Sequence, residues 1–600
     1  MQEKSHNRDK FRVFAFFIVF LAICSSASAA VWTNLVSGNA SGNWNNNANW
    51  DTGAYPDSQD AVADFSTLNI TAASVVTQNV ADGVTVGTMK FADATTASSD
   101  WTVISNSIEL SVSSDTPTIN VSNRTATIKS LLTGSQGFIK AGTGMLVLTN
   151  DNTGLSGGVT VASGFLQLNH LGGAGSGAVT LRHHDTIAAG GLIMNVSGTK
   201  DVTVDGANVT SGFSSSILVS NACNWSGTVT ISNYKNNSRY IGFAGGGTAA
   251  VINSTILWGT NNTVSNITFT GQGSFGGSGN LGGGILAIAP VNSPRVVRIS
   301  STNWLFGSVS LSADSSDNKV VMDVDNFFHG VQVSYSANNP VRGLVLDLNG
   351  HNQNIGGLVL SYGYNNPVVT NSSATNATLT LSGSGSYAFT NGVYAGWIAG
   401  NLSLVKTGAG TQTLGGTNTY TGATVISNGT LKITGSGLIS NSPAIVVVSG
   451  GRLDVTGLTN GWTLFSNQVL GGTGSVTGDV VVVGTLSPAD TNSVGALTVA
   501  GNLSLSSGAT CNCNYDKAQD TADEVRVSGN LALPSVATVN LQYSGDKPVN
   551  KLPLFSYGGV CSRTDFSGWS IAKGFSLQND ADAREVFVVP TPVGMVLTIQ

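Results

Sequence analysis

An all-β fold, a right-handed parallel β-helix that forms a rod with capping segments, is the fold class that this sequence predicts. Three observations support it: short runs of alternating apolar and polar residues, a segment that occurs twice, and a composition with very little charge. Charged residues make up 10% of the 600 residues, whereas 75 residues are glycine and 41% are apolar. A chain with this apolar content can bury a core, which separates it from disordered sequences of similar polarity.

The strand signal recurs along most of the chain. Runs such as VTVASGFLQL, ATLTLSGSG and TLKITGSG alternate apolar and polar residues, and Gly, Asn, Ser or Asp follow each run. Alternation between turn residues is typical of half-buried strands. Beyond the N-terminal segment, no stretch has a convincing helical period. We therefore expect very many short strands.

One segment of the chain occurs twice. Residues 138–168, FIKAGTGMLVLTNDNTGLSGGVTVASGFLQL, align with residues 404–433, LVKTGAGTQTLGGTNTYTGATVISNGTLKI. The positions that agree are Lys140, Gly142, Gly144, Leu148 and Asn152 in the first copy and Lys406, Gly408, Gly410, Leu414 and Asn418 in the second. The second copy continues with Tyr420, Gly422, Gly429 and Leu431, and Gly164 of the first copy matches Gly429 after a shift of one residue. A unit that repeats in this way fits a solenoid whose coils cover one another.

The abundant residue types suit the corners and outer faces of stacked coils. Gly adopts the backbone angles of tight corners, and Asn tolerates left-handed conformations there. Ser and Thr can form ladders on outward faces, whereas like charges repel one another at the strand spacing of about 4.8 Å. At roughly 20 to 25 residues per coil, the chain suffices for on the order of 20 coils and a rod about 100 Å long.

The repeated motifs resemble a known family. The order K-x-G-x-G-x-x-x-L, N-x-Y-x-G, a strand and N-G-x-L is similar to the autotransporter-associated β-strand repeat, also called the passenger-associated transport repeat. Residues 404–433 follow this order throughout, while residues 138–168 have Leu155 where tyrosine is expected. The resemblance implies a passenger-like rod of the pectin-lyase-like class, in which the matched residues have structural roles. An autotransporter ends in a membrane barrel of roughly 250 to 300 residues, and we expect this passenger-like chain to lack it.

The sequence indicates four parts. Residues 1–29 combine basic residues, a short apolar run and small residues, as secretory signal peptides do, and we predict cleavage between Ala29 and Ala30. The apolar run is too short to span a bilayer and does not recur, so we expect no transmembrane segment in the mature chain. The other parts are an N-terminal tryptophan-containing cap segment, the β-helix repeats and a closing β segment, at residues 30–110, 111–500 and 501–600.

Three short motifs resemble the signatures of serine β-lactamases. Ser197-Gly-Thr-Lys200, Ser316-Asp-Asn318 and Lys406-Thr-Gly408 stand in the chain order of those enzymes. The enzymes need a helix to bring the serine and the lysine together, but the sequence around Ser197 indicates strand, turn and strand. The repeat already explains Lys406. We therefore predict no catalytic residues.

The main alternative is a polysaccharide lyase or glycoside hydrolase built on a β-helix, which needs clustered carboxylates. Residues 206–313 and 348–453 contain no Asp or Glu. Two acidic groups remain: Asp314, Asp317, Asp323 and Asp325, and Asp516, Asp520, Asp523 and Glu524. The first either binds Ca²⁺ or is solvated at turns, and we favour solvated turns. The second we interpret as structural.

Cysteine and tryptophan leave further alternatives open. Cys511 and Cys513 would share one face of a strand, as a local disulfide, as part of a metal site or as isolated thiols, and we favour isolated thiols. The scattered tryptophans stack on sugars at the outer surface, cap turns or fill the core. They are Trp225, Trp258, Trp304, Trp397 and Trp462.

These observations together predict a scaffold. The net charge is −6 and Lys and Arg are scattered, so we expect no nucleic-acid partner. We expect an exported, non-enzymatic protein of the cell surface or extracellular space, outer-membrane association included, that holds no cofactor or metal. Its expected partners are extracellular glycans or other cell surfaces, bound through many weak contacts along the rod.

Overall fold

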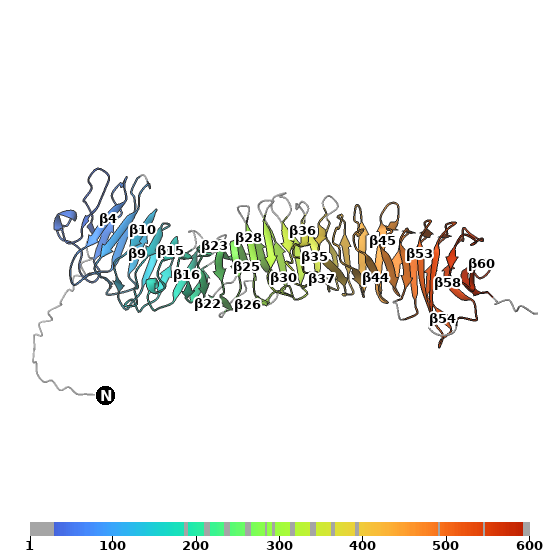
Figure 1. Ribbon diagram of the computed structural model, residues 1–600. Helices are drawn as coiled ribbons and strands as arrows, with labels where there is room; N and C mark the ends of the chain where they lie inside the picture. Colours follow the sequence, from blue (N-terminus) through green and yellow to red (C-terminus); the bar gives the residue numbers. More distant parts are fainter. Residues whose placement is uncertain are drawn as a thin grey trace, which may run out of the picture.

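The computed structural model of the chain is an elongated rod of stacked parallel strands (Figure 1). The predicted all-β parallel β-helix is thus confirmed. The structure describes residues 29–591 except residue 96 and residues 185–189, 209–215, 233–239, 259–265, 282–284, 291–294, 313–317, 336–343, 362–366, 391–394, 490–492 and 544–546. Residues 1–28 of the predicted signal peptide (1–29) therefore lie outside the described residues, and Ala29 and Ala30, on either side of the predicted cleavage point, begin the first strand.

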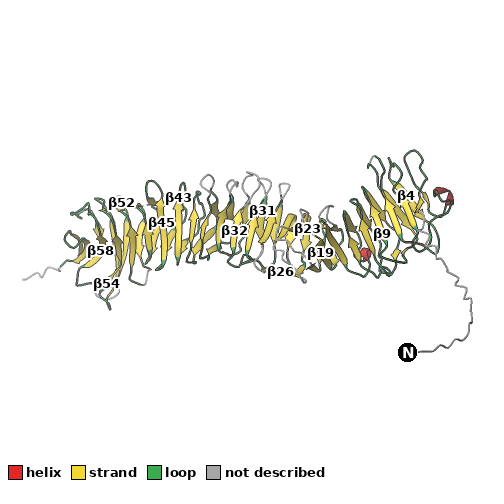
Figure 2. Cartoon of the chain, turned by 180° about the vertical axis from the view of Figure 1, so that it is seen from behind, coloured by secondary structure: helices red, strands yellow, loops and turns green. Residues whose placement is uncertain are grey.

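Helical structure in the described residues is confined to two short 3-10 turns, η1 (Asn47–Asn49) and η2 (Leu171–Ala174), drawn in red in Figure 2. No helix in this part of the chain has the length and apolarity needed to cross a membrane. The architecture is therefore made almost wholly of strands and corners.

Each coil contributes to three faces, and on each face the strands of successive coils pair in parallel. Face 1 consists of two sheets, one from β1 to β29 and one from β34 to β59. Its strands are β1 (Ala29–Val31), β3 (Val62–Phe65), β6 (Thr88–Phe91), β9 (Thr118–Val121), β12 (Phe138–Ala141), β14 (Val159–Val161), β16 (Val179–His184), β19 (Val202–Asn208), β22 (Thr228–Ser232), β24 (Thr255–Trp258), β26 (Ser278–Asn280), β29 (Asn303–Leu305), β34 (Gln353–Ile355), β37 (Ala377–Leu381), β40 (Leu402–Lys406), β42 (Thr424–Ile426), β44 (Ala444–Val447), β47 (Val469–Gly472), β50 (Thr485–Pro488), β53 (Thr510–Asp516), β57 (Thr538–Tyr543) and β59 (Ser570–Ile571).

Face 2 follows face 1 in each coil. Its strands are β2 (Gly42–Asn43), β4 (Ser74–Gln78), β7 (Trp101–Ser105), β10 (Thr125–Ile128), β13 (Met145–Leu148), β15 (Phe165–Leu168), β17 (Gly191–Met194), β20 (Ser216–Val219), β23 (Tyr240–Ile252), β25 (Asn266–Phe275), β27 (Ile285–Ala289), β30 (Ser308–Leu311), β32 (Gln332–Tyr335), β35 (Gly357–Leu360), β38 (Ser386–Ala388), β41 (Thr411–Leu414), β43 (Gly429–Thr434), β45 (Gly451–Gly457), β48 (Ser475–Thr477), β51 (Ala496–Ala500), β55 (Glu524–Val527) and β58 (Leu552–Tyr557).

Face 3 completes the coil and is the least regular of the three. Its strands are β5 (Val84–Val86), β8 (Ile108–Leu110), β11 (Leu132–Thr133), β18 (Gly198–Thr199), β21 (Asn224–Ser226), β28 (Val296–Ile299), β31 (Lys319–Met322), β33 (Val345–Asp347), β36 (Val368–Asn371), β39 (Trp397–Gly400), β46 (Trp462–Leu464), β49 (Val480–Val482), β52 (Leu503–Leu505) and β56 (Leu531–Ala532). In the middle of the rod the long strands β23 and β25 continue from face 2 onto face 3. Their pairing with the face 3 strands β21 and β28 shows this.

The core is a continuous apolar filling along the axis of the rod. Strand residues alternate: in β14, Val159 and Val161 are buried, while Thr160 between them points outward. The period-2 pattern of the sequence thus becomes one inward and one outward row on each face.

An aromatic cluster closes the N-terminal end of this core. The ring of Phe65 lies 5.1 to 5.6 Å, between centroids, from its five aromatic neighbours: Trp32, Trp44, Trp50, Phe91 and Trp101. The indole nitrogens are satisfied as well; for instance, Trp32 Nε1 donates to the carbonyl of Ala40 at 2.8 Å. The tryptophans of the predicted cap segment therefore pack inward and cover the first coils.

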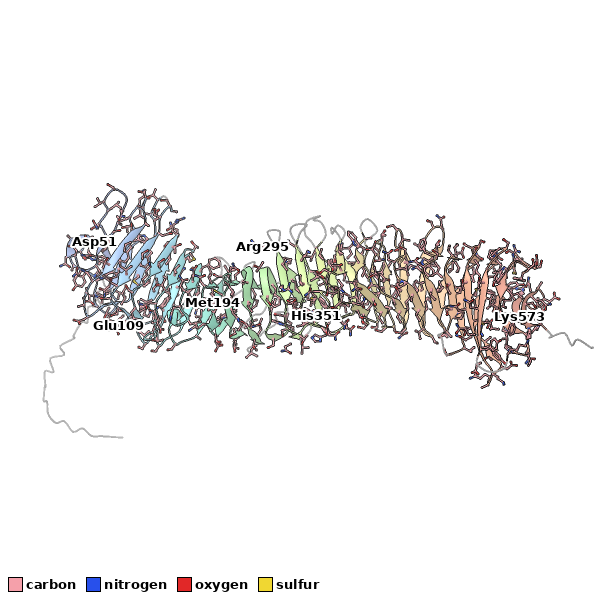
Figure 3. The ribbon with its side chains drawn as sticks, in the orientation of Figure 1. Asp51, Glu109, Met194, Arg295, His351 and Lys573 are labelled. Atoms are coloured by element: carbon pink, nitrogen blue, oxygen red, sulfur yellow. The ribbon has the colours of Figure 1, made fainter. Side chains whose placement is uncertain are left out.

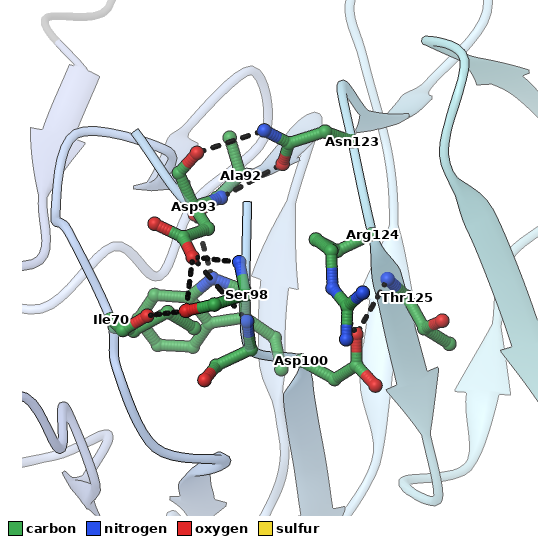
Figure 4. Close-up of polar contacts among 10 residues, drawn as sticks. Ile70, Ala92, Asp93, Ser98, Asp100, Asn123, Arg124 and Thr125 are labelled. Atoms are coloured by element: carbon green, nitrogen blue, oxygen red, sulfur yellow. Dashed lines mark hydrogen bonds and ion pairs between the residues drawn. The ribbon is translucent and has the colours of Figure 1, made fainter. Parts of the chain in front are cut away.

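Polar bonds between coils hold the loop that follows β6 (Figure 4). The Asn123 side chain donates to the Asp93 carbonyl at 2.8 Å and accepts from its N–H at 2.9 Å. The Asp93 carboxylate accepts from the N–H of Ser98 at 2.7 Å. Arg124 and Asp100 add an ion pair at 3.3 Å. Coils that are adjacent in space are thus fastened by side chains about 30 residues apart in sequence.

Antiparallel pairing marks the C-terminal end of the described rod. β60 (Phe575–Asp580) and β61 (Glu585–Pro590) form a hairpin, and β61 also pairs antiparallel with β58. β54 (Thr521–Ala522) pairs antiparallel with β53. The strict parallel stacking of the coils therefore gives way to hairpins in this region.

Candidate functional site

The lysine of each repeat copy is buried at the corner between faces 1 and 2. Lys140 Nζ donates to the carbonyls of Ala141, Gly142 and Ser163 at 3.0, 2.7 and 2.9 Å. The ammonium group thereby satisfies carbonyls of two successive coils, and burial lowers its pKa to about 7. Lys406 is also buried and donates to the carbonyl of Gly408, and burial lowers its pKa too.

The repeat glycines lie at the same corner, where backbones approach closely. Gly142 and Gly429 have φ values of +76° and +66°, a region that favours glycine. A Cβ on Gly429 would stand 2.2 Å from the carbonyl oxygen of Gly408 and 2.5 Å from that of Gly410. Gly164 makes the equivalent approach to Gly142 and Gly144. The glycines of one coil therefore stack directly on those of the next.

The repeat asparagines connect three successive coils on face 3. Asn152 Oδ1 accepts from the N–H of Leu132 at 2.8 Å, and its Nδ2 donates to the carbonyl of Gly173 at 2.7 Å. Asn418 makes the matching bonds to Ile398 N–H at 3.0 Å and to Leu438 carbonyl at 3.0 Å. Both side chains are fully buried. The amide thus replaces backbone pairing where face 3 has no regular strand.

The remaining matched residues also lie inside the coils. Leu148, Leu414 and Leu431 are fully buried. Tyr420 is buried with its hydroxyl 2.7 Å from Thr424 Oγ1, and burial raises its pKa. A Cβ on Gly422 would meet the Leu402 carbonyl oxygen at 2.4 Å. Leu155, which takes the place of tyrosine in the first copy, is fully buried as well.

The β-lactamase-like motifs do not come together. Ser197 Oγ accepts from the N–H of Asn224 in the following coil at 2.9 Å, whereas Lys200 Nζ donates to the carbonyl of Gly175 in the preceding coil at 2.8 Å. Asn318 is buried and bonded to backbone groups, and Ser316 lies outside the described residues. The structure gives these motifs separate roles in coil stacking.

The first acidic group is paired with side chains and main chain of neighbouring coils. Asp323 forms a two-pronged ion pair with Arg298. Asp325 accepts from the N–H of Asn352 at 2.7 Å and lies 3.3 Å from Nδ1 of His351, which is labelled in Figure 3. The predicted partners Asp314 and Asp317 lie outside the described residues. Within the described chain, no three His, Cys, Asp or Glu side chains gather as metal ligands would.

The second acidic group fixes the closing β segment. Asp523 is fully buried; its carboxylate accepts from the N–H of Gly495 at 2.9 Å and from the N–H of Asn514 at 2.9 Å. Glu524 accepts from Ser556 Oγ at 2.6 Å and from Arg526 Nε at 2.9 Å. These contacts agree with the structural interpretation.

Cys511 and Cys513 both point inward from β53 and are free thiols. Burial raises the pKa of Cys511 to about 12 and also raises that of Cys513. Cys223 and Cys561 are free and half-buried. The structure therefore supports isolated thiols at 511 and 513.

We predict that Cys511 and Cys513 resist thiol reagents in the folded protein, because the thiolate is disfavoured and the side chains are covered. A colorimetric disulfide reagent at pH 8 should modify half-buried Cys561 faster than either of them. Full reactivity of all cysteines should appear in guanidinium chloride. Mass mapping of the labelled peptides identifies which thiols react, and rapid labelling of Cys511 in the native protein would contradict its burial.

The described tryptophans of the middle and C-terminal regions largely fill the core. Trp225, Trp304 and Trp462 are at most 3% exposed, so they present no ring to a sugar. Trp397 is half-buried, and the side chain of Trp258 lies outside the described residues. The interpretation of these residues as core filling holds for the three buried rings.

A ladder of threonines runs along the outer surface of face 1. Thr160, Thr180, Thr203 and Thr230 stand in register on β14, β16, β19 and β22, one per coil. Oppositely charged residues also stand in register on adjacent coils of face 1. Lys90 Nζ lies 3.3 Å from the carboxylate of Asp64 on the adjacent coil. We refer to the four threonines as the threonine ladder.

A groove with a volume of about 330 Å³ opens on face 3 beside the second repeat copy. Leu438 and Phe465, 37% and 40% exposed, line it together with Leu458, Thr417 and Thr463. We refer to it as the face 3 groove. Local sequence patterns do not indicate it, because it depends on an interruption of the strand stack.

Comparison with known proteins agrees with the repeat motif. The family model of the passenger-associated-transport-repeat matches residues 138–168 and 404–433. The adhesin BmaC autotransporter of Brucella suis biovar 1 (strain 1330) is 31% identical over 205 residues, which is 32% of this chain and 6% of that protein. The chain thus matches only a small part of this relative.

A solved structure, that of the Haemophilus influenzae Hap adhesin, is similar with 12% identity and a TM-score of 0.27, covering 86% of this chain and 64% of the adhesin. Two matched repeats, each forming the same buried corner of a parallel β-solenoid, make the chain similar to the passenger regions of autotransporters that carry this repeat.

Proposed function

We propose that the protein is an exported, non-enzymatic scaffold of the cell surface or extracellular space whose outer faces adhere to glycans or other surfaces. The adhesin from Brucella suis supports an adhesive role. The observation that carries the proposal is the threonine ladder, because it repeats one hydroxyl group per coil over four successive coils of face 1. Regularly spaced weak contacts add up to avid attachment when they engage one extended partner.

The charges of the rod favour this function over the enzymatic alternative. The described acidic groups are engaged with main-chain N–H groups, hydroxyls or basic side chains, as Asp323 is with Arg298 and Asp523 with Gly495. A carboxylate held in this way is not poised as the acid or base of a glycosidase pair. We therefore propose adhesion without cleavage.

The division of the chain belongs to the same proposal. Removal of residues 1–29 would release a rod that begins at the aromatic cluster of the N-terminal coils. The segment 30–110 then serves as cap, residues 111–500 as the repeat body and residues 501–600 as the closing β segment.

A glycan array and a polysaccharide-degradation assay on the purified mature chain test the proposed function. We expect binding without release of reducing ends, and weaker binding by Thr203→Asp, which puts a charge in the middle of the threonine ladder. Thr127→Asp on face 2 is the matched control, since Thr127 is also a half-buried outward residue. Release of reducing ends would show the protein to be an enzyme. Equal effects of the two substitutions on glycan binding would show that the threonine ladder has no special role in binding.

A further inference from the structure

The stack of strands on face 3 is interrupted at the face 3 groove. Asn418 N–H donates to the Leu438 carbonyl at 3.1 Å, and Thr417 and Leu438 form a parallel bridge, so the stack reaches Leu438. The next strand on this face is β46, which pairs with β49 alone. One side of β46 is therefore a sheet edge, and it borders the groove that Leu438 and Thr463 line.

The backbone of Thr463 is directed at that edge. Trp462 N–H donates to the Asp479 carbonyl, and the Leu464 carbonyl accepts from Val483 N–H, both at 2.8 Å. Alternate residues of a strand direct their N–H and C=O groups to opposite sides. The N–H and C=O of Thr463 consequently point away from β49 toward the groove, and within the described chain no bond to its N–H is present.

Two other edge strands of the rod, β5 and β1, are protected at the equivalent place. β5 pairs with β8 just as β46 pairs with β49, and the outward N–H of Thr85 donates to the Asp57 carboxylate at 2.8 Å. On the edge strand β1, the outward N–H of Val31 donates to the Asp51 carboxylate at 2.7 Å. Such charged side chains block the addition of another strand. Among the residues that the structure describes, no carboxylate bonds the outward N–H of β46, and apolar side chains flank this edge instead.

We propose that the edge of β46 accepts an extended, uncharged peptide strand of a partner protein. The added strand pairs its main chain with the N–H and C=O of Thr463 and packs apolar side chains against Leu438 and Phe465. An extended peptide supplies alternating donors and acceptors at strand spacing, which is what the edge presents. No charged side chain of the described chain lines the groove, so a neutral strand fits it. This site is separate from the threonine ladder on face 1, and adhesion through the ladder does not depend on it.

A fluorescently labelled peptide of alternating threonine and valine, six residues long with blocked ends, is the probe for the full mature chain. We expect saturable binding by fluorescence anisotropy, together with slower hydrogen exchange in the segment that contains Thr463. A peptide with the same side chains, N-methylated at alternate residues so that one edge cannot donate, should not bind. Binding of both peptides with equal affinity would show that main-chain pairing is not involved.

Two variants test the site itself. Thr463→Pro removes the outward N–H but no bond to β49, and Leu438→Lys puts a charge into the groove; each should weaken peptide binding by roughly ten-fold or more. Val536→Lys is the control, because Val536 is 49% exposed and lies elsewhere. A thermal unfolding temperature equal to that of the wild type establishes that a variant is folded.

Three results would overturn the proposal: no binding of the peptide by the wild type, unchanged binding by folded Thr463→Pro, or protection of the Thr463 segment by neutral maltohexaose with no effect of the peptide. Self-association that Thr463→Pro abolishes would also overturn it, since the occupant would then be a second copy of the chain. Each readout is independent of the glycan array, so failure here leaves the proposed adhesive function standing.

Discussion

Replacement of Phe65 by alanine should destabilise the N-terminal coils by about 4 kcal/mol, the largest single effect that we expect in this chain. Phe65 is fully buried and its ring contacts five other aromatic rings, including Trp32, Trp50 and Trp101. Removal of the ring leaves a cavity that these large side chains cannot fill without moving their bonded indole nitrogens. Because solenoids unfold locally, the effect should appear as faster hydrogen exchange in the coils around β3.

The control for this prediction is Phe165→Ala, which removes the same ring from the outer surface, where Phe165 is 40% exposed. Its cost should be about 1 kcal/mol or less. Tryptophan fluorescence during urea unfolding includes the signal of the cap, where four of the ten tryptophans are gathered. Equal urea midpoints of unfolding for Phe65→Ala and the wild type would show that the aromatic cluster does not stabilise the end of the rod.

Replacement of Asn418 by leucine should cost about 3 kcal/mol, the second largest effect. The change keeps the approximate shape but leaves the N–H of Ile398 without its buried partner. It also removes one of the two bonds that the carbonyls of Gly416 and Leu438 accept, since each keeps a backbone donor. Unsatisfied buried backbone groups carry the full cost of desolvation. The loss should reach the coils on both sides, because the amide connects them.

Hydrogen exchange resolves this effect along the chain. Protection at Ile398 should fall in Asn418→Leu, together with protection in the coil that contains Leu438. Asn467→Leu is the control, since Asn467 is exposed. A loss of protection confined to the substituted coil would contradict the connection between coils that the structure shows.

The sequence predicts the repeated corner well, since its residues act locally. Lys140, Gly142 and Asn152 lie within about one coil of their partners, and their chemistry follows from their types: a long donor, a residue free of Cβ, and an amide that both donates and accepts. The alternation of apolar and polar residues likewise fixes which side chains fill the core. These features need no knowledge of the distance between coils.

Features that depend on register between coils could not be predicted. Thr203 and Thr230 are 27 residues apart and still stand in register, whereas Thr160 and Thr180 are 20 apart, because the lengths of the corners differ. A search of the sequence for a constant repeat length therefore does not detect the threonine ladder. The open edge of β46 could not be predicted either. Strand pairing on face 3 stops at Leu438, and no local sequence pattern indicates this position.

The acidic residues show a second limit of sequence reasoning. Asp323 and Asp325 are close in sequence, and from the sequence we favour solvated turns over a Ca²⁺ site for them, but each faces a different partner from another coil, Arg298 and His351. Asp51 and Asp57 gave no signal in the sequence, yet they cover the edges of two strands. Ionic partners in a solenoid come from neighbouring coils, so spacing along the chain does not identify them.

The central claim is that the lysine and asparagine of the repeat are internal supports, while binding takes place on the outer faces. It is tested most directly by measuring, for Lys140→Met and Asn418→Leu, both the free energy of unfolding and the glycan binding per folded molecule. Lys129→Met, at an exposed lysine, serves as reference. The account predicts reduced stability with unchanged binding per folded molecule. Wild-type stability combined with lost binding would contradict it and make the repeat motif a binding site.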